Sequence, residues 1–274
     1  MKAAILYWKR QPLRVEDVEL DQPGHGEVLV RVDAAGVCHS DYHFMNGDLP
    51  IPLPCVLGHE GAGIVEEVGP GVSAVAPGDH VVMLFRAGCG RCEFCQRGRP
   101  ALCAMAGQIR NSGGLVDGTS RLHRAGGALH HFLGVSCFAE RTVLPEQGIV
   151  KINPEISLEV AALMGCAVMT GIGAVMNTAQ VEPGANVLVI GAGGVGLNVV
   201  MGAVLVGANR IIVADLLDSK LELAHSFGAT HLINAKDQDV VAAVRALTGG
   251  EGADYAFEVI GNPKTMATAY QAVR

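Results

Sequence analysis

The stretch Val187-Leu188-Val189-Ile190-Gly191-Ala192-Gly193-Gly194-Val195-Gly196 decides the fold of the second half of the chain. Its four leading apolar residues are typical of a buried strand. The glycines follow the pattern Gly-x-Gly-x-x-Gly and open an apolar segment that we expect to be helical to about Val206. Glycines at these positions let backbone N–H groups and a helix N-terminus approach a pyrophosphate. The stretch therefore predicts a strand–turn–helix unit that binds a dinucleotide.

The same stretch has a second interpretation as a membrane span. Between Val187 and Ala208 the only strongly polar residue is Asn198, and 22 such residues are long enough to cross a bilayer. Four glycines within six positions would weaken the centre of such a helix. We therefore favour the buried unit and expect no membrane association. The N-terminus lacks a signal peptide, so we expect a cytoplasmic protein.

Strands and helices alternate from about residue 168 onward. We expect further strands at 211–214, 231–234 and 255–259, with helices at 217–227 and 240–247. Continuous apolar strands with intervening helices predict a parallel sheet that is covered on both faces. We assign residues 168–274 to this domain. It has four predicted strands where six are usual, and we expect the chain to stop within the helix after the fourth, as a C-terminally truncated domain.

Residues 1–167 read instead as short strands separated by glycine and proline turns, which predicts a barrel or sandwich. Val28, Val30 and Val32 alternate with other residues along one such strand. Half of the 274 residues are apolar, so the chain can fill a large core. The formal net charge of −7 argues against nucleic-acid binding over the whole surface.

Four of the eight cysteines form the most specific motif in the chain. Cys89, Cys92, Cys95 and Cys103 have the spacing C-x2-C-x2-C-x7-C. Thiolates at this spacing can wrap one tetrahedral Zn²⁺ within a single loop, residues 89–103. An iron–sulfur cluster is the alternative, but ferredoxin-type runs place the fourth cysteine after three residues and follow it with proline. We favour a closed, structural zinc site.

Cys38, His59 and Cys166 are the candidates for a second, open metal site. Two thiolates and one imidazole form a known catalytic zinc set with the fourth position left for water or substrate. The spacing alone is a weak signal, because isolated cysteines are usually core residues. Polar residues crowd the turn that carries Cys38, and glycines flank Gly58-His59-Glu60-Gly61.

The chain resembles the zinc-dependent alcohol dehydrogenases of the medium-chain dehydrogenase/reductase superfamily. The resemblance rests on motifs in family order over the whole chain: residues 36–41, 58–60, the four-cysteine loop, 117–121, 131–134, 165–166 and 191–196. It implies an α/β protein with a GroES-like β-barrel catalytic domain and a Rossmann domain. It also implies two zinc ions per chain, the catalytic one held by Cys38, His59 and Cys166.

The resemblance implies further roles in catalysis. Glu60 corresponds to a carboxylate that approaches the metal during ligand exchange, and Asp41 to the partner that fixes the His59 tautomer. Ser40 would take the proton of the alcohol, and the nicotinamide ribose would pass it to His43. From sequence alone, a surface histidine is the other interpretation of His43. Phe85 and Phe138 correspond to walls of the substrate pocket, although aromatic residues at such positions are often plain core.

Other residues correspond to the family's cofactor site. His39 is placed against the pyrophosphate, Thr170 beside the nicotinamide amide, and Lys220 near the adenosine ribose, together with Gly191, Gly193, Gly194, Val195 and Gly196 of the glycine turn. Asp215 lies 24 residues after Gly191 and can accept hydrogen bonds from the ribose hydroxyls. It would repel a 2′-phosphate, which favours NAD over NADP. Its other interpretation is a helix cap.

The predicted reaction is oxidation of a primary or aryl alcohol to an aldehyde with NAD. The alternative substrate is S-(hydroxymethyl)glutathione. Relatives that use it carry arginine four residues after the last structural cysteine, where this chain has Gly107, and tend to have tyrosine in place of His43. Arg110 can supply a displaced charge. A catalytically inactive zinc- and nucleotide-binding protein is the third possibility. We expect the full-length parent to form a homodimer or homotetramer.

Overall fold

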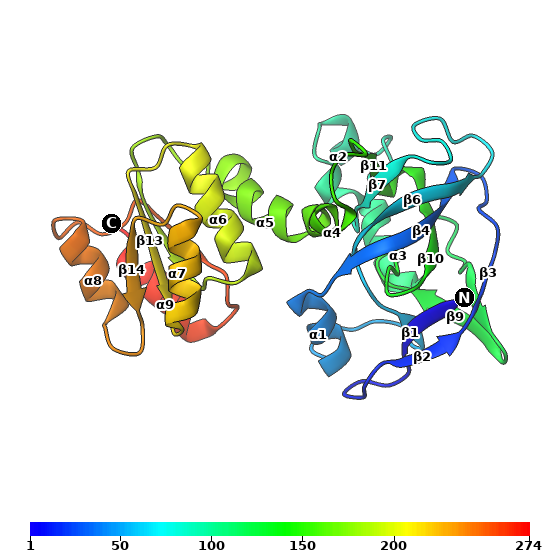
Figure 1. Cartoon of the computed structure of the whole chain (residues 1–274), viewed down its shortest axis with the longest axis horizontal. Coiled ribbons are helices and arrows are strands. Elements are labelled where there is room, and N and C mark those ends of the chain that lie inside the picture. The colour runs from blue at the N-terminus through cyan, green and yellow to red at the C-terminus, as the bar shows by residue number, and fades with distance from the viewer. The chain divides into compact units, whose positions relative to one another are not determined.

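The protein is described by a computed structural model that covers Met1 to Arg274. Its contacts divide the chain into two compact units, Met1–Cys166 and Ala167–Arg274 (Figure 1). The boundary predicted from sequence lies one residue further along the chain.

The first unit is built on two mainly antiparallel sheets, as the short strands and frequent turns predict. The six-stranded sheet has the order β2-β1-β5-β9-β8-β3, and the five-stranded sheet has the order β10-β4-β6-β7-β11. The strands of the first sheet are β1 (Lys2–Leu6), β2 (Arg14–Asp17), β3 (Glu19–Leu20), β5 (Cys55–Val56), β8 (Leu122–Arg124) and β9 (Gly127–His131). Those of the second are β4 (Glu27–Gly36), β6 (Glu60–Val68), β7 (His80–Met83), β10 (Arg141–Pro145) and β11 (Ile149–Lys151).

Short helices connect these strands. They are α1 (His39–Asn46), α2 (Glu93–Gln96), α3 (Ala104–Ser112) and α4 (Leu158–Ala162), with 3₁₀ turns at Pro100–Leu102, Glu146–Gly148 and Leu163–Gly165. The alternation of β4 places Val28 and Val30 in a buried cluster with residues of β6 and β7. Cys55 and Cys137 are fully buried among apolar side chains, and burial raises the pKa of both thiols. These two cysteines are therefore packing residues.

The second unit is a four-stranded parallel sheet in the order β14-β13-β12-β15. This is the order 3-2-1-4 of a Rossmann sheet. Its elements are α5 (Ala167–Gly173), a π-helical turn (Ala174–Thr178), β12 (Asn186–Ile190), α6 (Gly194–Leu205), β13 (Arg210–Asp215), α7 (Asp218–Ser226), β14 (His231–Asn234), α8 (Val240–Leu247), β15 (Tyr255–Glu258) and α9 (Pro263–Ala272).

Both faces of this sheet are covered, and the central residues of β12 and β13 are accordingly apolar and buried. Val187 and Val189 of β12 pack into a cluster with α6 and α7. Leu188 and Ile190 of the same strand pack into the opposite cluster with α8 and α9. The predicted strand–turn–helix unit is thereby confirmed. No single helix is long and apolar enough to cross a membrane; only Leu158–Gly165 and Ala167–Thr178 taken together reach that length and composition.

The prediction that the chain stops inside a helix is wrong. Helix α9 ends at Ala272, and Val273 forms a parallel bridge with Ala253. The Arg274 backbone N–H donates to the Ala253 carbonyl, and its side chain pairs with Asp254 at 2.6 Å. A short β-bridge and an ion pair are features that side-chain periodicity does not reveal.

Candidate active site

The first metal-type cluster lies where β4, α1 and β6 meet in the first unit. Cys38 precedes the first residue of α1, so its sulfur lies at a helix N-terminus, where a thiolate is favoured. Gly36 ends β4, and a Cβ at that position would lie 2.4 Å from a carboxylate oxygen of Glu60. The absence of a side chain at residue 36 therefore leaves room for the Glu60 carboxylate in its present position.

A buried carboxylate holds His59 in one orientation. Asp41 Oδ1 lies 3.1 Å from His59 Nδ1, and Asp41 Oδ2 accepts a hydrogen bond from the Cys38 backbone N–H at 3.1 Å. Both side chains are almost completely buried. Because Nδ1 faces a carboxylate, Nε2 is the nitrogen that is available as a ligand. Gly58 makes this turn possible: its φ is +92°, and a Cβ there would lie 2.5 Å from the Phe138 backbone nitrogen.

The candidate ligand atoms converge. One atom each from Cys38, His59, Glu60 and Cys166 lies within 4.8 Å of the other three. Two sulfurs and one imidazole nitrogen are a donor set that Zn²⁺ favours, and the Glu60 carboxylate lies beside these three donors. The chain's residues therefore fit a catalytic zinc ion. Cys166 follows the 3₁₀ turn that ends at Gly165, far along the chain from the other three.

The ionisation of this cluster also suits a divalent cation. The thiol of Cys166 donates to Cys38, which lowers the pKa of Cys38 and raises that of Cys166. Burial raises the pKa of Glu60 to about 7. For His59, burial lowers the pKa, but the hydrogen bonds and negative charges of Asp41 and Cys38 together outweigh this effect and raise the pKa to about 9. The Cys38 and Cys166 thiols and the Glu60 carboxyl belong to one cluster, so the negative charge of one disfavours ionisation of the others. A bound Zn²⁺ would stabilise their ionised forms.

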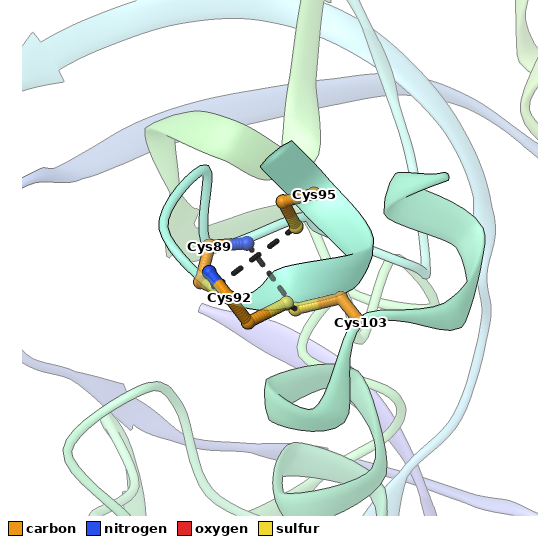
Figure 2. Close-up of side chains that lie close together, drawn as sticks. All are labelled: Cys89, Cys92, Cys95 and Cys103. Carbon is orange, nitrogen blue, oxygen red and sulfur yellow. Dashed lines mark hydrogen bonds between the residues drawn. The ribbon is translucent and has the colours of Figure 1, made fainter. Parts of the chain in front are cut away.

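The second cluster is the four-cysteine loop (Figure 2). The sulfurs of Cys89 and Cys95 are 4.0 Å apart, and those of Cys92 and Cys103 are 3.9 Å apart. With Zn–S bonds of about 2.3 Å, a tetrahedral site has S···S edges of about 3.8 Å. Backbone N–H groups already point at the sulfurs: Cys92 N–H donates to Cys89 Sγ, and Cys89 N–H donates to Cys103 Sγ, each at 3.3 Å. The loop fits one structural zinc ion.

Backbone hydrogen bonding affects the acidity of this loop. The pKa of Cys92 is lowered to about 6, mainly by the hydrogen bond from the backbone of Cys95. Cys95 lies in the short helix α2, which places its backbone amide near the Cys92 sulfur.

Aromatic rings border the first cluster. The Phe85 ring centroid lies 5.3 Å from that of His59, and the fully buried Phe132 lies 5.6 Å from it. Phe138 is partly buried and packs against two apolar clusters of the first unit. Sequence reasoning did not single out Phe132, because an apolar residue in a Phe-Leu-Gly run carries no signal of a neighbouring imidazole.

Helix α1 carries the predicted proton-transfer residues. Ser40 is half-buried, and its backbone and hydroxyl groups make hydrogen bonds to the Cys38 sulfur. His43 lies three residues later, on the same helix face as Ser40. Its Nδ1 lies 3.0 Å from Asp48 Oδ2, a partner that the sequence did not suggest. His39 is exposed, and its ring lies 4.8 Å from that of His43.

The glycine turn of the second unit has the form that a pyrophosphate requires. Gly191 has a φ of +102°, and a Cβ on Gly196 would lie 1.9 Å from the Gly191 carbonyl oxygen. A Cβ on Gly193 or Gly194 would meet nothing within 4 Å. The turn is therefore packed on its inner side and open on the outer side, at the N-terminus of α6. Val195 lies in the first turn of that helix.

Asp215 ends β13 and links three backbone amides. Its Oδ2 accepts from Ala192 N–H at 2.8 Å, and its Oδ1 accepts from Leu216 and Leu217 N–H at 2.7 and 3.1 Å. The carboxylate thus ties the glycine turn to the start of α7, in addition to any contact with a cofactor. Lys220 is exposed in the first turn of α7, and Thr170 is exposed on α5.

Comparison with known proteins identifies the family. Residues 24–154 match the alcohol dehydrogenase GroES-like domain, and residues 194–274 match the zinc-binding dehydrogenase domain. The chain belongs to the zinc-dependent alcohol dehydrogenases. It is 46% identical to an S-(hydroxymethyl)glutathione dehydrogenase of Synechocystis sp. over 98% of this chain and 74% of that relative.

Two solved structures are similar to this zinc-dependent alcohol dehydrogenase over 99% of its length and 74% of theirs. An alcohol dehydrogenase zinc-binding domain protein from Burkholderia ambifaria is 42% identical, with a TM-score of 0.94. Benzyl alcohol dehydrogenase from Acinetobacter calcoaceticus is 37% identical, with a TM-score of 0.92. The GroES-like and Rossmann-type domains expected from the resemblance are confirmed.

Proposed function

We propose that this zinc-dependent dehydrogenase oxidises S-(hydroxymethyl)glutathione with NAD as the hydride acceptor. The convergence of Cys38, His59, Glu60 and Cys166 carries the reaction class, because it provides an open zinc site beside a buried carboxylate. The substrate rests on the 46% identity to a relative of that name. From the sequence alone we preferred a primary or aryl alcohol and kept S-(hydroxymethyl)glutathione as the alternative; the identity to this relative reverses that preference.

The groups of this chain have distinct roles in that reaction. When bound, zinc supplies a positive charge that acidifies the alcohol, and NAD accepts the hydride. Cys38, His59 and Cys166 would hold the metal. Ser40 takes the proton from the alcohol oxygen, and His43 delivers it to solvent. Asp215 excludes a 2′-phosphate and so selects NAD, while Phe85 limits the width of the substrate site beside His59.

A simple primary or aryl alcohol is the second candidate substrate. Gly107 and His43 favour it, because the family's glutathione-adduct dehydrogenases carry arginine at the first position and tend to have tyrosine at the second. The structural likeness to a benzyl alcohol dehydrogenase also supports it. Arg110, exposed on α3, is the residue that we propose to replace the missing positive charge.

The test compares kcat/KM for S-(hydroxymethyl)glutathione, benzyl alcohol and ethanol in the unmodified protein and in Arg110→Ala. We expect the glutathione adduct to be the best substrate. Arg110→Ala should lower only its kcat/KM, by about tenfold, as for loss of one charge-assisted contact. Gly107→Arg is the complementary variant, because it places arginine where the family's glutathione-adduct dehydrogenases carry it. The structure has room for the side chain, since a Cβ at residue 107 meets nothing within 4 Å. A higher kcat/KM for benzyl alcohol, with no effect of Arg110→Ala, would assign the second substrate class.

All eight cysteines are free thiols in this structure. Six of them belong to the two metal-type clusters and two are buried packing residues. This usage suits a reducing compartment, and it supports our proposal of a cytoplasmic location. We also propose a homodimer or homotetramer for the assembled enzyme.

A further inference from the structure

We propose that Asp48 is a positioning residue for proton release: its carboxylate holds His43 in the tautomer whose Nε2 accepts the departing proton. This inference rests on the proposed function of His43. Asp48 Oδ2 lies 3.0 Å from His43 Nδ1. A carboxylate can only accept a hydrogen bond, so Nδ1 must carry the hydrogen and Nε2 keeps its lone pair. A neutral imidazole in this form can take one proton at Nε2 and then release it to water.

The turn after α1 fixes Asp48 relative to His43. Gly47 has a φ of +86° and ends the helix, and its N–H donates to the His43 carbonyl at 3.1 Å. The Asp48 N–H donates to the same carbonyl at 3.0 Å. This is the hydrogen-bond pattern of a glycine-terminated helix. The backbone and side chain of Asp48 therefore both bind His43.

A second side chain orients the carboxylate. Asn46 Nδ2 donates to Asp48 Oδ1 at 3.0 Å, which leaves Oδ2 for His43. The Arg10 Nε donates in turn to the Asn46 carbonyl at 3.3 Å. The hydrogen bond from His43, followed by that from Asn46, lowers the pKa of Asp48 below its usual value. Asp48 is accordingly ionised at neutral pH, as an acceptor for His43 must be.

The surroundings of His43 leave Asp48 as its only carboxylate partner. The His39 ring packs edge-on against His43, and the nearby basic groups are Arg10 and Lys9, whose side chain lies beside Gly47. Both members of the pair are about half exposed, at 45% and 46% of their side chains. The pair can therefore exchange its proton with water, which a fully buried pair could not do.

The decisive comparison is between Asp48→Asn and Asp48→Ala. Asparagine keeps the shape, and Asn46 Nδ2 requires the new amide oxygen on its own side, so the NH₂ group faces Nδ1. Nδ1 must then accept, and Nε2 must carry the hydrogen. Alanine leaves Nδ1 to water, and both tautomers remain accessible. We expect Asp48→Asn to lower kcat by about fivefold and Asp48→Ala by about twofold, the range expected for an exposed ion pair, with KM unchanged. A merely structural role predicts the opposite order, because alanine removes more contacts with the turn.

Asp21→Asn is the matched control. Asp21 forms a similarly exposed pair with His123 at 2.7 Å, on the six-stranded sheet and outside the candidate site. We expect its kcat to equal that of the unmodified protein. Equal losses in Asp21→Asn and Asp48→Asn would overturn the proposal.

Nitrogen-15 NMR of the imidazole gives a readout that does not depend on turnover. The His43 resonances, assigned with His43→Gln, should show protonated Nδ1 in the unmodified protein and protonated Nε2 in Asp48→Asn. A mainly Nε2-protonated His43 in the unmodified protein would overturn the proposal even if the enzyme is active. Absence of alcohol oxidation with the predicted tautomers intact would instead contradict the proposed function and leave the positioning of His43 supported.

Discussion

Two aspartates position the candidate sites of this protein through hydrogen bonds to neighbouring backbone amides and side chains. Asp41 orients both Cys38 and His59, and Asp215 joins the glycine turn to α7. The sequence indicates such roles only through position, because an aspartate after a strand is equally typical of a cofactor contact and a helix cap. In the structure Asp215 accepts hydrogen bonds from the amides of Ala192, Leu216 and Leu217, all of which precede α7, so it is not the cap of that helix. Its role toward the ribose remains our proposal.

Asp215 provides a prediction on cofactor choice. We expect the unmodified protein to prefer NAD strongly over NADP, because the carboxylate repels a 2′-phosphate. Asp215→Gly should narrow the ratio of kcat/KM values for the two cofactors by about tenfold or more. It should also lower thermal stability, since three amide hydrogen bonds are lost. Equal use of both cofactors by the unmodified protein would contradict the assignment.

His131 provides a prediction on pH. It is buried, its Nε2 accepts the Arg121 backbone N–H at 3.2 Å, and its Nδ1 has no partner. Burial lowers the pKa of His131 to about 3. In the unfolded chain His131 binds a proton below about pH 6.5, whereas in the folded protein it stays neutral down to about pH 3. The free energy of unfolding therefore falls as the pH drops from about 6.5 toward 3.

His131→Gln should reduce this loss. One proton is worth at most about 1.4 kcal/mol per pH unit, so the difference between the urea unfolding free energies of the two proteins should shrink as the pH falls below about 6.5. If the unfolding free energies of the two proteins fell in parallel over this pH range, His131 would not be the group that causes the loss of stability.

At the scale of elements, turns position the ligands and strands supply the scaffold. The alternation in β4 and the continuous apolar runs in β12 and β13 were predictable from sequence, because burial imposes a period on the residues. The Asp48–His43 contact was not predictable, since it depends on the left-handed turn at Gly47. The contact of Phe132 with His59 likewise joins residues that are distant in the sequence.

The four-cysteine loop and the active-site cluster should respond differently to loss of a thiol. We expect two zinc ions per chain in the unmodified protein and one in either Cys95→Ser or Cys38→Ser, measured by elemental analysis. Cys95→Ser should lower the unfolding temperature substantially, since a closed zinc site contributes to folding. Cys38→Ser should abolish turnover and leave the fold largely intact. Iron in the loop, or one zinc in the unmodified protein, would contradict the two-site assignment.

For the whole molecule, the sequence motifs predicted the protein family correctly, whereas they did not determine the substrate. The metal sites and the glycine turn follow from spacing and the chemistry of the donor atoms. We propose that substrate choice depends on residues such as Phe85 and on single charges such as Arg110, and motif spacing does not predict such effects. The chain spans 74% of the length of the relatives with which it was compared. The sheet order 3-2-1-4 ends at β15, which pairs with β12 on one side.

We propose that alcohol oxidation occurs at the cluster of Cys38, His59 and Cys166. The most direct test is the rate of NADH formation by the purified, zinc-containing protein with S-(hydroxymethyl)glutathione, measured beside Cys38→Ser and the control Cys55→Ser. Cys55 is a buried packing residue outside both metal-type clusters. We predict turnover in the unmodified protein and in Cys55→Ser, and none in Cys38→Ser. Undiminished NADH formation by Cys38→Ser would contradict the account.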